Sequence, residues 1–539
     1  MLLPLVLYLV PAAVIYILVR NYALLPASIP GPLLARFTNL HRLFSVFCSS
    51  PHDDQVRLHD RHGPFVRLGP NMVSVRGAPY ASQIYGIGKG FVKSDYYSVF
   101  QNIVNGKRTA SLVAMTDESD HARTKRVIAH AYSLSTLVEY EPLVDSTIAV
   151  LLENLSTRFA KTGTKCDFGQ YLQYFAFDVI GELTFSKRLG FMEQDEDVDG
   201  IIAAIGSNFR YFSVLGQMPW VDGLLGKNPI YVRYLRKPVS SPILAFAQKL
   251  LQERLRSLDD DAEDKITDSD HSRAAKPDFL SRFLQARKDS EEPDLTTDAK
   301  LLSYLFMNIN AGSDTIASTL KGIFYYLLTS PAALEKLMDE LCTAQTQGEL
   351  STPCPTYAET QALPYLQAVI KEGLRLNPAL SLPLERVVPK GGITLSATDE
   401  KISSSSTMSQ TSVHLPAGTI VGINPYVQHR DPSIFCPPLD DIAPASSSEH
   451  LYPIHAFHPS RWLEPNERTT KRMEHALLTF GAGKRSCLGK NIAMLEVCKV
   501  VVAVLLRFEL ELVDPKAWQV ENKWVLDQKG LVVRMKERS

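Results

Sequence analysis

The segment Phe480-Gly481-Ala482-Gly483-Lys484-Arg485-Ser486-Cys487-Leu488-Gly489 decides the fold of this chain. It places one thiol in a glycine-rich turn, directly before an apolar helical segment that starts near Leu488. Gly481 and Gly483 permit positive φ, so the backbone can fold closely around the sulfur. Free N–H groups at the start of the helix favour a thiolate. The pattern predicts that Cys487 binds iron, and the alternative is a structural cysteine that follows a turn.

Neighbouring residues suit a flat cofactor that carries carboxylates. Gly489 has no side chain, which leaves room against the helix, and Arg485 can pair with a carboxylate. The whole segment, including Phe480, resembles the haem-binding loop of the cytochromes P450. This resemblance implies haem b with Cys487 as its axial ligand, and contacts from Phe480, Arg485 and Gly489.

Composition fits one large globular unit. The 539 residues are 45% hydrophobic and the net charge is −1, so nothing favours nucleic acid as a partner. The seven cysteines are odd in number and scattered, without a CxxC pair, which argues against a disulfide framework or a zinc site. Nothing in the sequence indicates an obligate oligomer.

The N-terminus predicts a membrane anchor. Residues 1–19 carry no charged side chain, and the apolar character resumes after Arg20, so residues 1–25 are about long enough to span a bilayer as a helix. A cleavable signal peptide is the competing interpretation, but no basic residue precedes the apolar run. Basic residues follow it, which predicts a single-pass protein with its bulk in the cytosol. Residues 26–35 then form a proline-rich, non-helical connector, and residues 36–539 form the catalytic domain.

The remaining chain is expected to be mainly helical with small sheets. Residues 62–75 predict a β-hairpin around Gly69-Pro70-Asn71, and residues 120–255 have helical periodicity. We expect an exposed acidic loop at 258–276, a helix of roughly 50 Å from about Thr297 to Thr329, and solvated insertions at 402–412 and 437–449.

The long helix contains Ala311-Gly312-Ser313-Asp314-Thr315, and a glycine with polar neighbours is locally unfavourable there. One interpretation is a helix crossing at Gly312 with Asp314 facing solvent. The resemblance offers another, because the central helix of cytochromes P450 carries Ala/Gly-Gly-x-Asp/Glu-Thr. It implies that Asp314 supplies protons and that Thr315 holds the oxygen species. Ile316 departs from the second threonine that the family often has.

Glu372 and Arg375 lie three residues apart on a predicted helix between Pro364 and Pro378, so they share one face. Surface pairs of this kind contribute little, but the apolar flank and a possible third partner, Arg461, favour a buried cluster. In cytochromes P450 such a Glu-x-x-Arg pair and a later arginine lock the core around the haem loop. We therefore assign Glu372, Arg375 and Arg461 a structural role.

Three weaker candidates are implied by the resemblance to bind the haem propionates. His121 and Lys125 are four residues apart on a basic helical segment, where the family has Trp/His-x-x-x-Arg. Lysine offers a point charge and not a bidentate fork. Arg386 stands where the family usually supplies another propionate-binding arginine. The alternative for His121 and Lys125 is an ordinary basic surface, and a lone arginine such as Arg386 indicates nothing without the resemblance.

The resemblance covers most of the chain and implies the cytochrome P450 fold, mainly α with small β-sheets, preceded by one transmembrane helix. Details such as FHPSRWL look most like fungal microsomal members of the pisatin demethylase and benzoate para-hydroxylase groups. The implied activity is a haem-thiolate monooxygenase that activates O2 and hydroxylates or otherwise oxidises a small, largely apolar substrate. Specialised-metabolite biosynthesis at the endoplasmic reticulum is the expected setting.

No dinucleotide-binding fingerprint is present, so electrons must come from a separate protein, expected to be an NADPH-dependent flavoprotein reductase on the same membrane. A basic face that includes Arg123, Lys125 and Arg126 is the hypothesised docking surface. Two rival functions stay open. One is a reductase-independent haem-thiolate enzyme that rearranges peroxides, and the other is a non-catalytic haem-binding protein.

Overall fold

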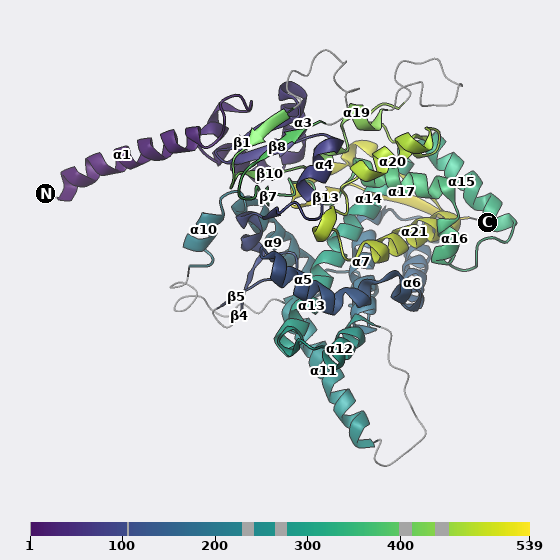
Figure 1. Cartoon of the computed structure of the whole chain (residues 1–539). Coiled ribbons are helices and arrows are strands. Elements are labelled where there is room, and N and C mark those ends of the chain that lie inside the picture. Colours follow the sequence, from purple (N-terminus) through teal and green to yellow (C-terminus); the bar gives the residue numbers. More distant parts are fainter. Residues whose placement is uncertain are drawn as a thin grey trace.

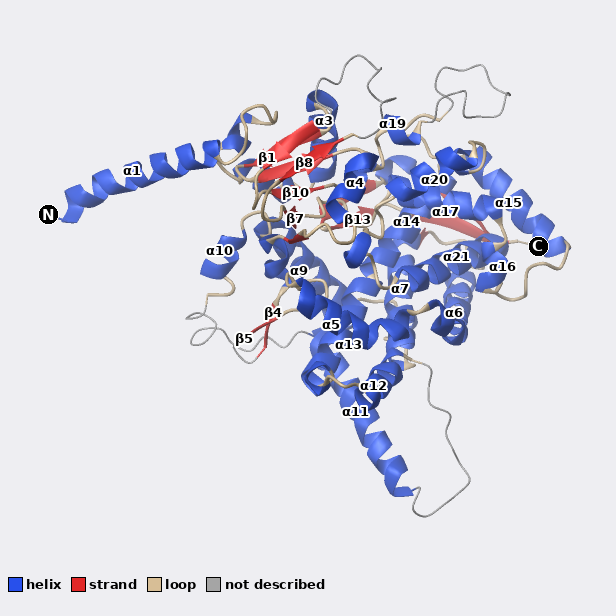
Figure 2. Ribbon diagram, in the orientation of Figure 1, coloured by secondary structure: helices blue, strands red, loops and turns tan. Residues whose placement is uncertain are grey.

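The computed structural model describes residues 2–104, 107–228, 242–264, 278–397, 412–436 and 452–538. Helices make up most of the body, and Figure 2 shows the sheet that contains β1 on the side from which α1 projects. The architecture is mainly α with small β-sheets, as the sequence predicts.

Among the described residues, five short strands form the largest sheet, in the order β1-β2-β10-β7-β3. Their bounds are β1 Phe65–Gly69, β2 Met72–Val75, β3 Val92–Lys93, β7 Arg386–Val387 and β10 Ile420–Gly422. The predicted hairpin is confirmed: β1 and β2 pair antiparallel from Phe65 opposite Val75, and both strands are fully buried. Antiparallel pairing of β3 with β7 sets Lys93 opposite Arg386.

The other strands form a three-stranded sheet and three two-stranded pairs among the described residues. Their bounds are β4 Asn102–Val104, β5 Lys107–Thr109, β6 Cys166–Asp167, β8 Ile393–Ser396, β9 Ser412–Leu415, β11 Phe508–Leu512, β12 Gln519–Lys523, β13 Val525–Lys529 and β14 Val532–Glu537. The β12–β13 hairpin matters for the site, because Trp524 alone joins its strands.

Long helices that each bury at least one apolar face form the core. They are α6 Leu134–Leu155, α7 Phe168–Phe185, α13 Asp298–Gly312, α14 Asp314–Leu328, α17 Pro364–Leu376 and α21 Lys490–Arg507. α7 packs against α6, α13 and α14, and α21 packs against α6 and α14 (Figure 1). Fifteen of the eighteen positions of α7 are buried, which explains why its sequence lacks a polar face.

The remaining α-helices surround this core. They are α1 Leu2–Ala23, α2 Leu40–Phe47, α3 Pro51–His62, α4 Ala78–Tyr85, α5 Glu118–Ile128, α8 Phe191–Gln194, α9 Ile201–Leu215, α10 Pro219–Leu224, α11 Pro242–Asp264, α12 Phe279–Asp289, α15 Pro331–Thr346, α16 Tyr357–Gln361, α18 Pro425–Gln428, α19 Pro432–Phe435 and α20 Glu467–Ala476. Because α11 continues to Asp264, the acidic loop expected at 258–276 is wrong over its first residues. Residues 265–277 lie outside the described residues, as do 402–411 and 437–449 of the expected insertions.

The long central helix has the predicted ends but is not continuous. Thr297 caps α13 by accepting a hydrogen bond from the Lys300 N–H, and α14 ends at Leu328. Ser313 separates the two helices, with φ −86° and ψ −72°. Its hydroxyl donates to the Ile309 carbonyl at 2.6 Å, and the Thr315 hydroxyl donates to the Ala311 carbonyl at 2.7 Å. These side-chain bonds compete with the helical backbone bonds and explain the interruption.

α1 projects from the body as a single rod (Figure 1). Its C-terminal end is held by Arg67 of β1, which is buried and donates to the carbonyls of Asn21, Leu25 and Pro70. The connector is non-helical as far as Pro32, and a 3-10 turn follows over Leu33–Arg36. Within the part of the chain that the structure describes, no helix has both the length and the hydropathy of a membrane span, so the transmembrane helix expected over residues 1–25 is not supported.

Candidate functional site

One cavity of about 300 Å³ lies between the central helix and the Cys487 loop. Thr315 lines it from α14, and Cys487 lines it from the loop. It is also lined by all six residues predicted to contact the cofactor: His121, Lys125, Arg386, Phe480, Arg485 and Gly489. Segments far apart in the sequence therefore meet here, as their predicted roles require.

The Cys487 loop is shaped by two glycines. Gly481 has φ +63° and Gly483 has φ +64°, a region that disfavours other residues. A Cβ on Gly483 would lie 1.9 Å from the Tyr85 carbonyl oxygen, so α4 packs directly on the loop backbone. The Cys487 N–H donates to the Phe480 carbonyl at 2.8 Å and closes the turn.

The Cys487 thiol is accessible from the cavity, although it lies deep in the protein. Burial raises its pKa, while N–H groups of Gly489 and Lys490 and the charge of Lys490 act in the opposite direction. From the sequence we expected only the groups that lower the pKa of Cys487. The pKa is raised overall, which corrects that expectation. A bound metal cation reverses the balance, because a coordinating thiol is deprotonated outright.

Basic side chains gather at one end of the cavity. Lys93 and Arg386 come from paired strands, His121 and Lys125 from α5, and Arg485 from the loop. Burial lowers the pKa of Lys93 well below its usual range, and Arg386 and Arg485 lower it further. Burial and the charge of Arg485 lower the pKa of His121 to about 3, so the ring is neutral. This cluster favours an anionic ligand group.

Arg485 has capacity for such a group. It donates to Glu118 at 2.7 and 2.9 Å, and its third nitrogen, Nη1, is buried without a hydrogen-bond partner. A buried guanidinium nitrogen of this kind is costly unless a ligand satisfies it. Lys125 makes only a 3.3 Å contact with the Lys484 carbonyl and is also available to a ligand.

The site fits haem, which the family implies. A thiol faces the cavity, and a Cβ built on Gly489 meets no atom within 4 Å, so a flat group has room beside α21. The basic cluster matches two propionates, and the unpartnered Arg485 nitrogen matches a carboxylate oxygen. The remaining walls are largely apolar, as a macrocycle requires.

Glu372, Arg375 and Arg461 form one fully buried cluster. Arg375 donates to Glu372 through two bonds of 2.8 Å, and Arg461 Nε lies 3.3 Å from the same carboxylate. The indole N–H of Trp462 and the backbone N–H of His458 each add a bond of 3.0 Å. Burial acts to raise the pKa of Glu372, but the two arginines outweigh it and hold the pKa at about 2.

This cluster is connected to the Cys487 loop through His429. Arg375 Nη1 donates to the His429 carbonyl at 3.0 Å, and His429 Nδ1 donates to the Arg375 carbonyl at 3.1 Å. His429 Nε2 then accepts the Leu478 N–H at 2.8 Å, two residues before Phe480. Glu372, Arg375 and Arg461 thus lie together as their sequence pattern predicts, whereas no motif in the sequence indicates His429 as the connection.

Asp314 and Thr315 lie on different sides of the central helix. Thr315 lines the cavity of Cys487, whereas Asp314 lines a second cavity and accepts a 2.8 Å hydrogen bond from Gln173 Nε2. Consecutive helical residues differ by about 100° in direction, so neighbours naturally face different surroundings. Asp314 is half-buried and bonded to Gln173, so it does not simply face solvent as the alternative interpretation expects. Burial raises the pKa of its carboxyl to about 6.

The site also contains residues that sequence reasoning missed. Trp524 lines the cavity from the tip of the β12–β13 hairpin with φ +83°, which is strained for a non-glycine residue. Asn308 of α13 lines the cavity as well. Its side-chain oxygen Oδ1 accepts a hydrogen bond from the Tyr132 hydroxyl, and its Nδ2 is buried without a partner. Neither residue belongs to a recognisable motif.

Apolar side chains form much of the cavity wall. Leu380 and Leu382 line it, whereas Phe100 and Phe306 are not among its lining residues. Phe100 instead packs on Phe212 and Trp524, with ring centroids 4.6 Å apart in both pairs.

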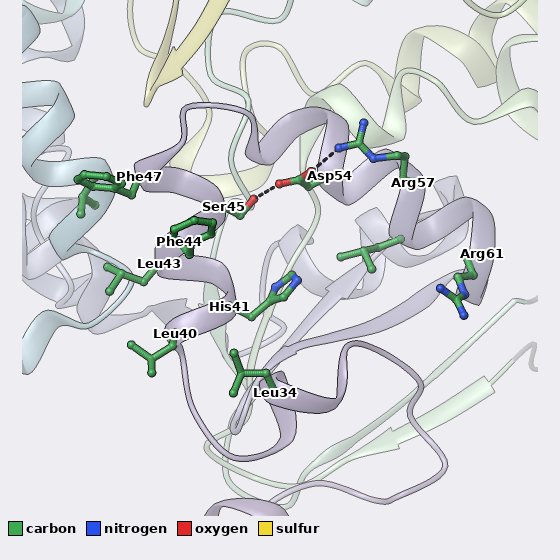
Figure 3. A pocket seen from close by; sticks show the side chains of 12 residues that line it. Leu34, Leu40, His41, Leu43, Phe44, Ser45, Phe47, Asp54, Arg57 and Arg61 are labelled. Atoms are coloured by element: carbon green, nitrogen blue, oxygen red, sulfur yellow. Dashed lines mark hydrogen bonds and ion pairs between the residues drawn. The ribbon is translucent and has the colours of Figure 1, made fainter.

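A larger surface groove of about 710 Å³ lies between α2 and α3 (Figure 3). One wall is apolar, with Leu40, Phe44 and Phe47, and Arg57 and Arg61 lie at its other end. Asp54, the carboxylate that lines this groove, is engaged by Ser45 and Arg57, and no cysteine is among the lining residues. The cavity of Cys487 is therefore the candidate active site.

Comparison with known proteins agrees with this geometry. The model of the family described as cytochrome P450 matches residues 29–535. The chain belongs to the cytochrome P450 family, and it is a cytochrome P450 monooxygenase, an oxidoreductase whose family uses a cysteine-ligated haem.

Curated relatives are fungal. A cytochrome P450 monooxygenase of Aspergillus terreus is 41% identical over 508 residues, which cover 94% of this chain and 95% of that protein. The monooxygenase cicH of Emericella nidulans is 38% identical over 517 residues, covering 95% and 94%. The monooxygenase mpaDE of Penicillium roqueforti is 38% identical over 514 residues, and there the match spans 95% of this chain but only 55% of the relative.

Proposed function

We propose that this enzyme oxidises a small, largely apolar organic substrate in fungal specialised metabolism, with haem held by Cys487 and electrons delivered from NADPH by a separate flavoprotein reductase. The observation that carries the proposal is the meeting of an accessible thiol and a basic cluster in one otherwise apolar cavity. The fungal relatives support the setting.

The roles of the residues follow from their positions. Cys487 would hold the haem iron through its thiolate, and Arg485, Arg386, Lys125 and His121 would hold the carboxylates of the haem. The tight turn and the N–H groups of Gly489 and Lys490 stabilise the thiolate form. When bound, a haem with a thiolate ligand supplies the reduction and cleavage of dioxygen.

On the other side of the cavity, Thr315 holds the oxygen-binding groove open. Its hydroxyl bonds the Ala311 carbonyl next to the break at Ser313, where the helix departs from regular geometry. Asp314 provides the acid that exchanges protons with this region. Apolar side chains such as Ile316, Leu380 and Leu382 exclude bulk water and hold the substrate.

Carbon monoxide difference spectroscopy of the reduced protein tests the assignment of Cys487. We expect a Soret band at the red-shifted thiolate–CO position that is lost in Cys487→Ala. A Cys498→Ala variant is the control, because that thiol is also buried and lies on α21 but does not line the cavity. A band typical of imidazole- or thiol-ligated haem in the wild-type protein, or no haem at all, would refute the proposal.

A reductase-independent peroxide rearrangement is the rival that Thr315 distinguishes. If the proposed function is right, Thr315→Ala keeps haem and substrate binding but uncouples NADPH oxidation from product, by roughly tenfold or more for the loss of an oriented proton-transfer group. The measurement is product formed per NADPH consumed. Turnover with an organic peroxide but none with the reductase would favour the rival.

The reductase docking surface needs revision. Arg123, which we expected there, is engaged by Glu292 at 2.6 Å and by Asp294 at 3.5 Å, and Lys125 faces the cavity. A groove of about 810 Å³ between α4 and α20 instead reaches Gly483 of the Cys487 loop. Its exposed basic residues on α20 are Arg468, Lys471, Arg472 and His475.

We infer that an acidic reductase docks over this groove. Charge reversal by Arg468→Glu with Arg472→Glu should weaken reductase-supported turnover several-fold and reduce its salt dependence, while Arg123→Glu should have a smaller effect. The carbon monoxide spectrum checks that all variants keep their haem. Equal losses in the two sets of variants would contradict the inference.

We also propose that the protein attaches to a membrane, and we base this on exposed apolar side chains and not on a membrane-spanning helix. Large apolar side chains of α1 are exposed, among them Tyr8, Ile15 and Val19. Leu40, Phe44 and Phe47 of α2 are exposed as well and form the apolar wall of the groove in Figure 3. Such surfaces mark membrane or protein contacts. A chain without residues 1–25 should lose most of its association with microsomal vesicles in a sedimentation assay.

A further inference from the structure

Trp524 is held in a conformation that tryptophan rarely adopts. It alone joins β12 to β13, and its φ of +83° lies in the left-handed region, which bulky side chains avoid. A residue in such a region costs free energy and persists where its neighbours fix it, often at a position that binds a ligand. The strain therefore points to a role for the indole ring beyond closing the hairpin.

Asn522 fixes the backbone of Trp524. It is 1% exposed, its Oδ1 accepts the Trp524 N–H at 3.2 Å, and its Nδ2 donates to the Ser381 carbonyl at 2.8 Å. Next to Ser381, Leu380 forms an antiparallel bridge with Val525 and also lines the cavity of Cys487. The tip of the hairpin is thus docked on a segment that forms part of the cavity wall.

The indole ring is supported by two buried aromatic side chains. Its centroid lies 4.6 Å from that of Phe100 and 5.2 Å from that of Phe209 of α9, with an interplanar angle of 56° in both pairs. Neither phenylalanine lines the cavity, whereas the half-buried Trp524 does. A firmly held indole on a cavity wall favours a flat ring as its ligand, because aromatic pairs gain more than the area that they bury.

Asn310 places a polar group in the same cavity from α13. Its Nδ2 donates to the Phe306 carbonyl one turn earlier at 2.7 Å, which fixes the orientation of the amide. Among the described residues, none donates a hydrogen bond to its Oδ1. When a ligand displaces water from the cavity, this oxygen loses its hydrogen bonds unless the ligand supplies a donor. The amide therefore favours a substrate that carries a hydroxyl.

The spacing of Asn310 and Thr315 relates this hydroxyl to the reacting end of the substrate. The two residues are five positions apart on the central helix, which at 1.5 Å per residue is about 7.5 Å along its axis. Two fused six-membered rings have a similar length. A hydroxyl bonded to Asn310 therefore leaves the opposite end of such a ring system beside Thr315.

We propose that the substrate is a flat aromatic compound with a phenolic hydroxyl, whose ring stacks on Trp524 and whose hydroxyl donates to Asn310 Oδ1. The inference rests on the proposed function, to which it adds the chemical class of the substrate. The apolar side chains of Leu380 and Leu382 line the same cavity and contact the rest of the ring system.

The alternative is that both side chains serve only the fold. Trp524 then fills space beside Phe100 and Phe209, and the Asn310 amide only bonds its own helix. Both possibilities predict that replacing either residue lowers stability. Only the proposal predicts that the ring and the amide oxygen each control a separate preference among ligands.

Three probe compounds of similar size separate the two preferences. The flat 2-naphthol carries a hydroxyl, trans-2-decalol carries a hydroxyl on rings that are not flat, and 2-methoxynaphthalene is flat but cannot donate. Equilibrium dialysis of the holoenzyme measures the Kd of each, and the Soret shift of the ferric haem checks that the probe lies beside the haem. We expect the wild-type protein to bind 2-naphthol several-fold more tightly than either of the other probes.

Variants of the two residues should remove one preference each. Trp524→Gly suits the positive φ and removes the ring, so it should abolish the preference for 2-naphthol over trans-2-decalol. Trp524→Leu should do the same, and Trp524→Tyr, which keeps a ring, should retain most of that preference. Asn310→Leu should abolish only the preference for 2-naphthol over 2-methoxynaphthalene. Comparing ratios of Kd between variants cancels the different hydrophobicity of the probes.

Trp518→Leu and Ser303→Ala are the matched controls. Trp518 stacks on Tyr325 with ring centroids 4.1 Å apart, Ser303 lies on α13, and neither lines the cavity of Cys487. Both variants should keep the wild-type ratios of Kd. The carbon monoxide difference spectrum checks that each variant keeps an intact haem site.

The proposal is overturned if the wild-type protein binds the three probes with equal Kd or does not bind 2-naphthol. A preference that survives removal of the side chain assigned to it overturns the proposal as well. Failure of the proposed function has a different signature. A missing thiolate–CO band in the wild-type protein would refute the role of Cys487, while equilibrium dialysis would still report both preferences.

Discussion

Replacing Glu372 by a residue of the same shape should strongly lower the stability of the fold. Glu372→Gln removes one charge and leaves the buried guanidiniums of Arg375 and Arg461 without their counter-ion, because all three side chains are 0% exposed. We expect a loss of about 3 kcal/mol in the free energy of unfolding, measured by urea denaturation.

The adjacent Lys371 provides a matched control, since its pair with Glu474 is partly exposed. Lys371→Met should cost less than about 1 kcal/mol. The pKa of Glu372 is held at about 2, below its usual 4.5, so the stabilisation is complete above pH 4.5 and is lost as pH falls toward 2. The deficit of Glu372→Gln should shrink over that window, and a constant deficit would contradict the ionic origin.

Gly483 tests how tightly the Cys487 loop must close. In Gly483→Ala the new Cβ meets the Tyr85 carbonyl oxygen and the residue must also keep a positive φ, so the loop cannot pack on α4. We expect loss of haem binding together with a destabilisation of more than about 2 kcal/mol. The control is Gly163→Ala, which has φ +69° but nothing within 4 Å of the new atom and should cost only the backbone strain. Normal haem content in Gly483→Ala would be the contrary result.

At the residue scale, sequence reasoning succeeded where a motif fixes the spacing. The placement of Thr315, Arg386 and Arg485 around one cavity follows from resemblance alone, and Glu372 with Arg375 follows from helical geometry. It failed where a role depends on tertiary neighbours. The direction of the Cys487 pKa depends on burial, and Lys93 is an unremarkable lysine until β3 pairs with β7.

At the scale of elements, Arg67 joins the end of α1 to the β1–β2 hairpin. Its buried side chain donates to the carbonyls of Asn21 in α1, of Leu25 just before the connector and of Pro70 in the hairpin turn. Arg67→Met would leave those carbonyls unsatisfied, at about 1–3 kcal/mol for each desolvated group, so α1 and the connector should detach before the body unfolds. Limited proteolysis should then cut within residues 24–36 at least several-fold faster.

Arg36 is the control for this effect, because its single bond to the Ala27 carbonyl, 3.2 Å long, is exposed. Arg36→Met should be cut at close to the wild-type rate. Equal protection of the Arg67 and Arg36 variants would show that α1 is held by other contacts.

The elements differ in how well they can be predicted from the sequence. The β1–β2 hairpin has two short runs with β-branched residues around a Gly-Pro-Asn turn, both local signals, and it forms as predicted. The ends of the central helix also have local signals, Thr297 at the start and the proline after Thr329 at the end. The break at Ser313 has no local signal, because it depends on which carbonyls the Ser313 and Thr315 hydroxyls bind in the packed helix.

For the whole molecule, buried histidines predict acid sensitivity. His59 is fully buried, with Nδ1 2.9 Å from the Gly63 carbonyl and Nε2 2.8 Å from the Ser74 hydroxyl, and burial lowers its pKa to about 3. Between pH 6.5 and 3 the unfolded chain binds a proton that the folded chain does not. Stability therefore falls as pH falls, by about 1.4 kcal/mol per pH unit for each such group.

His59→Gln should flatten this dependence, and the measurement is the free energy of unfolding at several pH values between 3 and 7. Glutamine keeps one donor and one acceptor but does not titrate in this range. His130 is exposed, so His130→Gln should leave the slope as it is in the wild-type protein. An unchanged slope in His59→Gln would assign the acid sensitivity elsewhere.

The break at Ser313 lies where the central helix separates two cavities. Residues that shape the substrate face one way, and Gln173 and Lys321 with Asp314 face the other. Leu380 and Leu382 line the cavity of Cys487 and not the cavity of Asp314. An engineer can therefore reshape the substrate side at these two positions while the side chains around Asp314 keep their places.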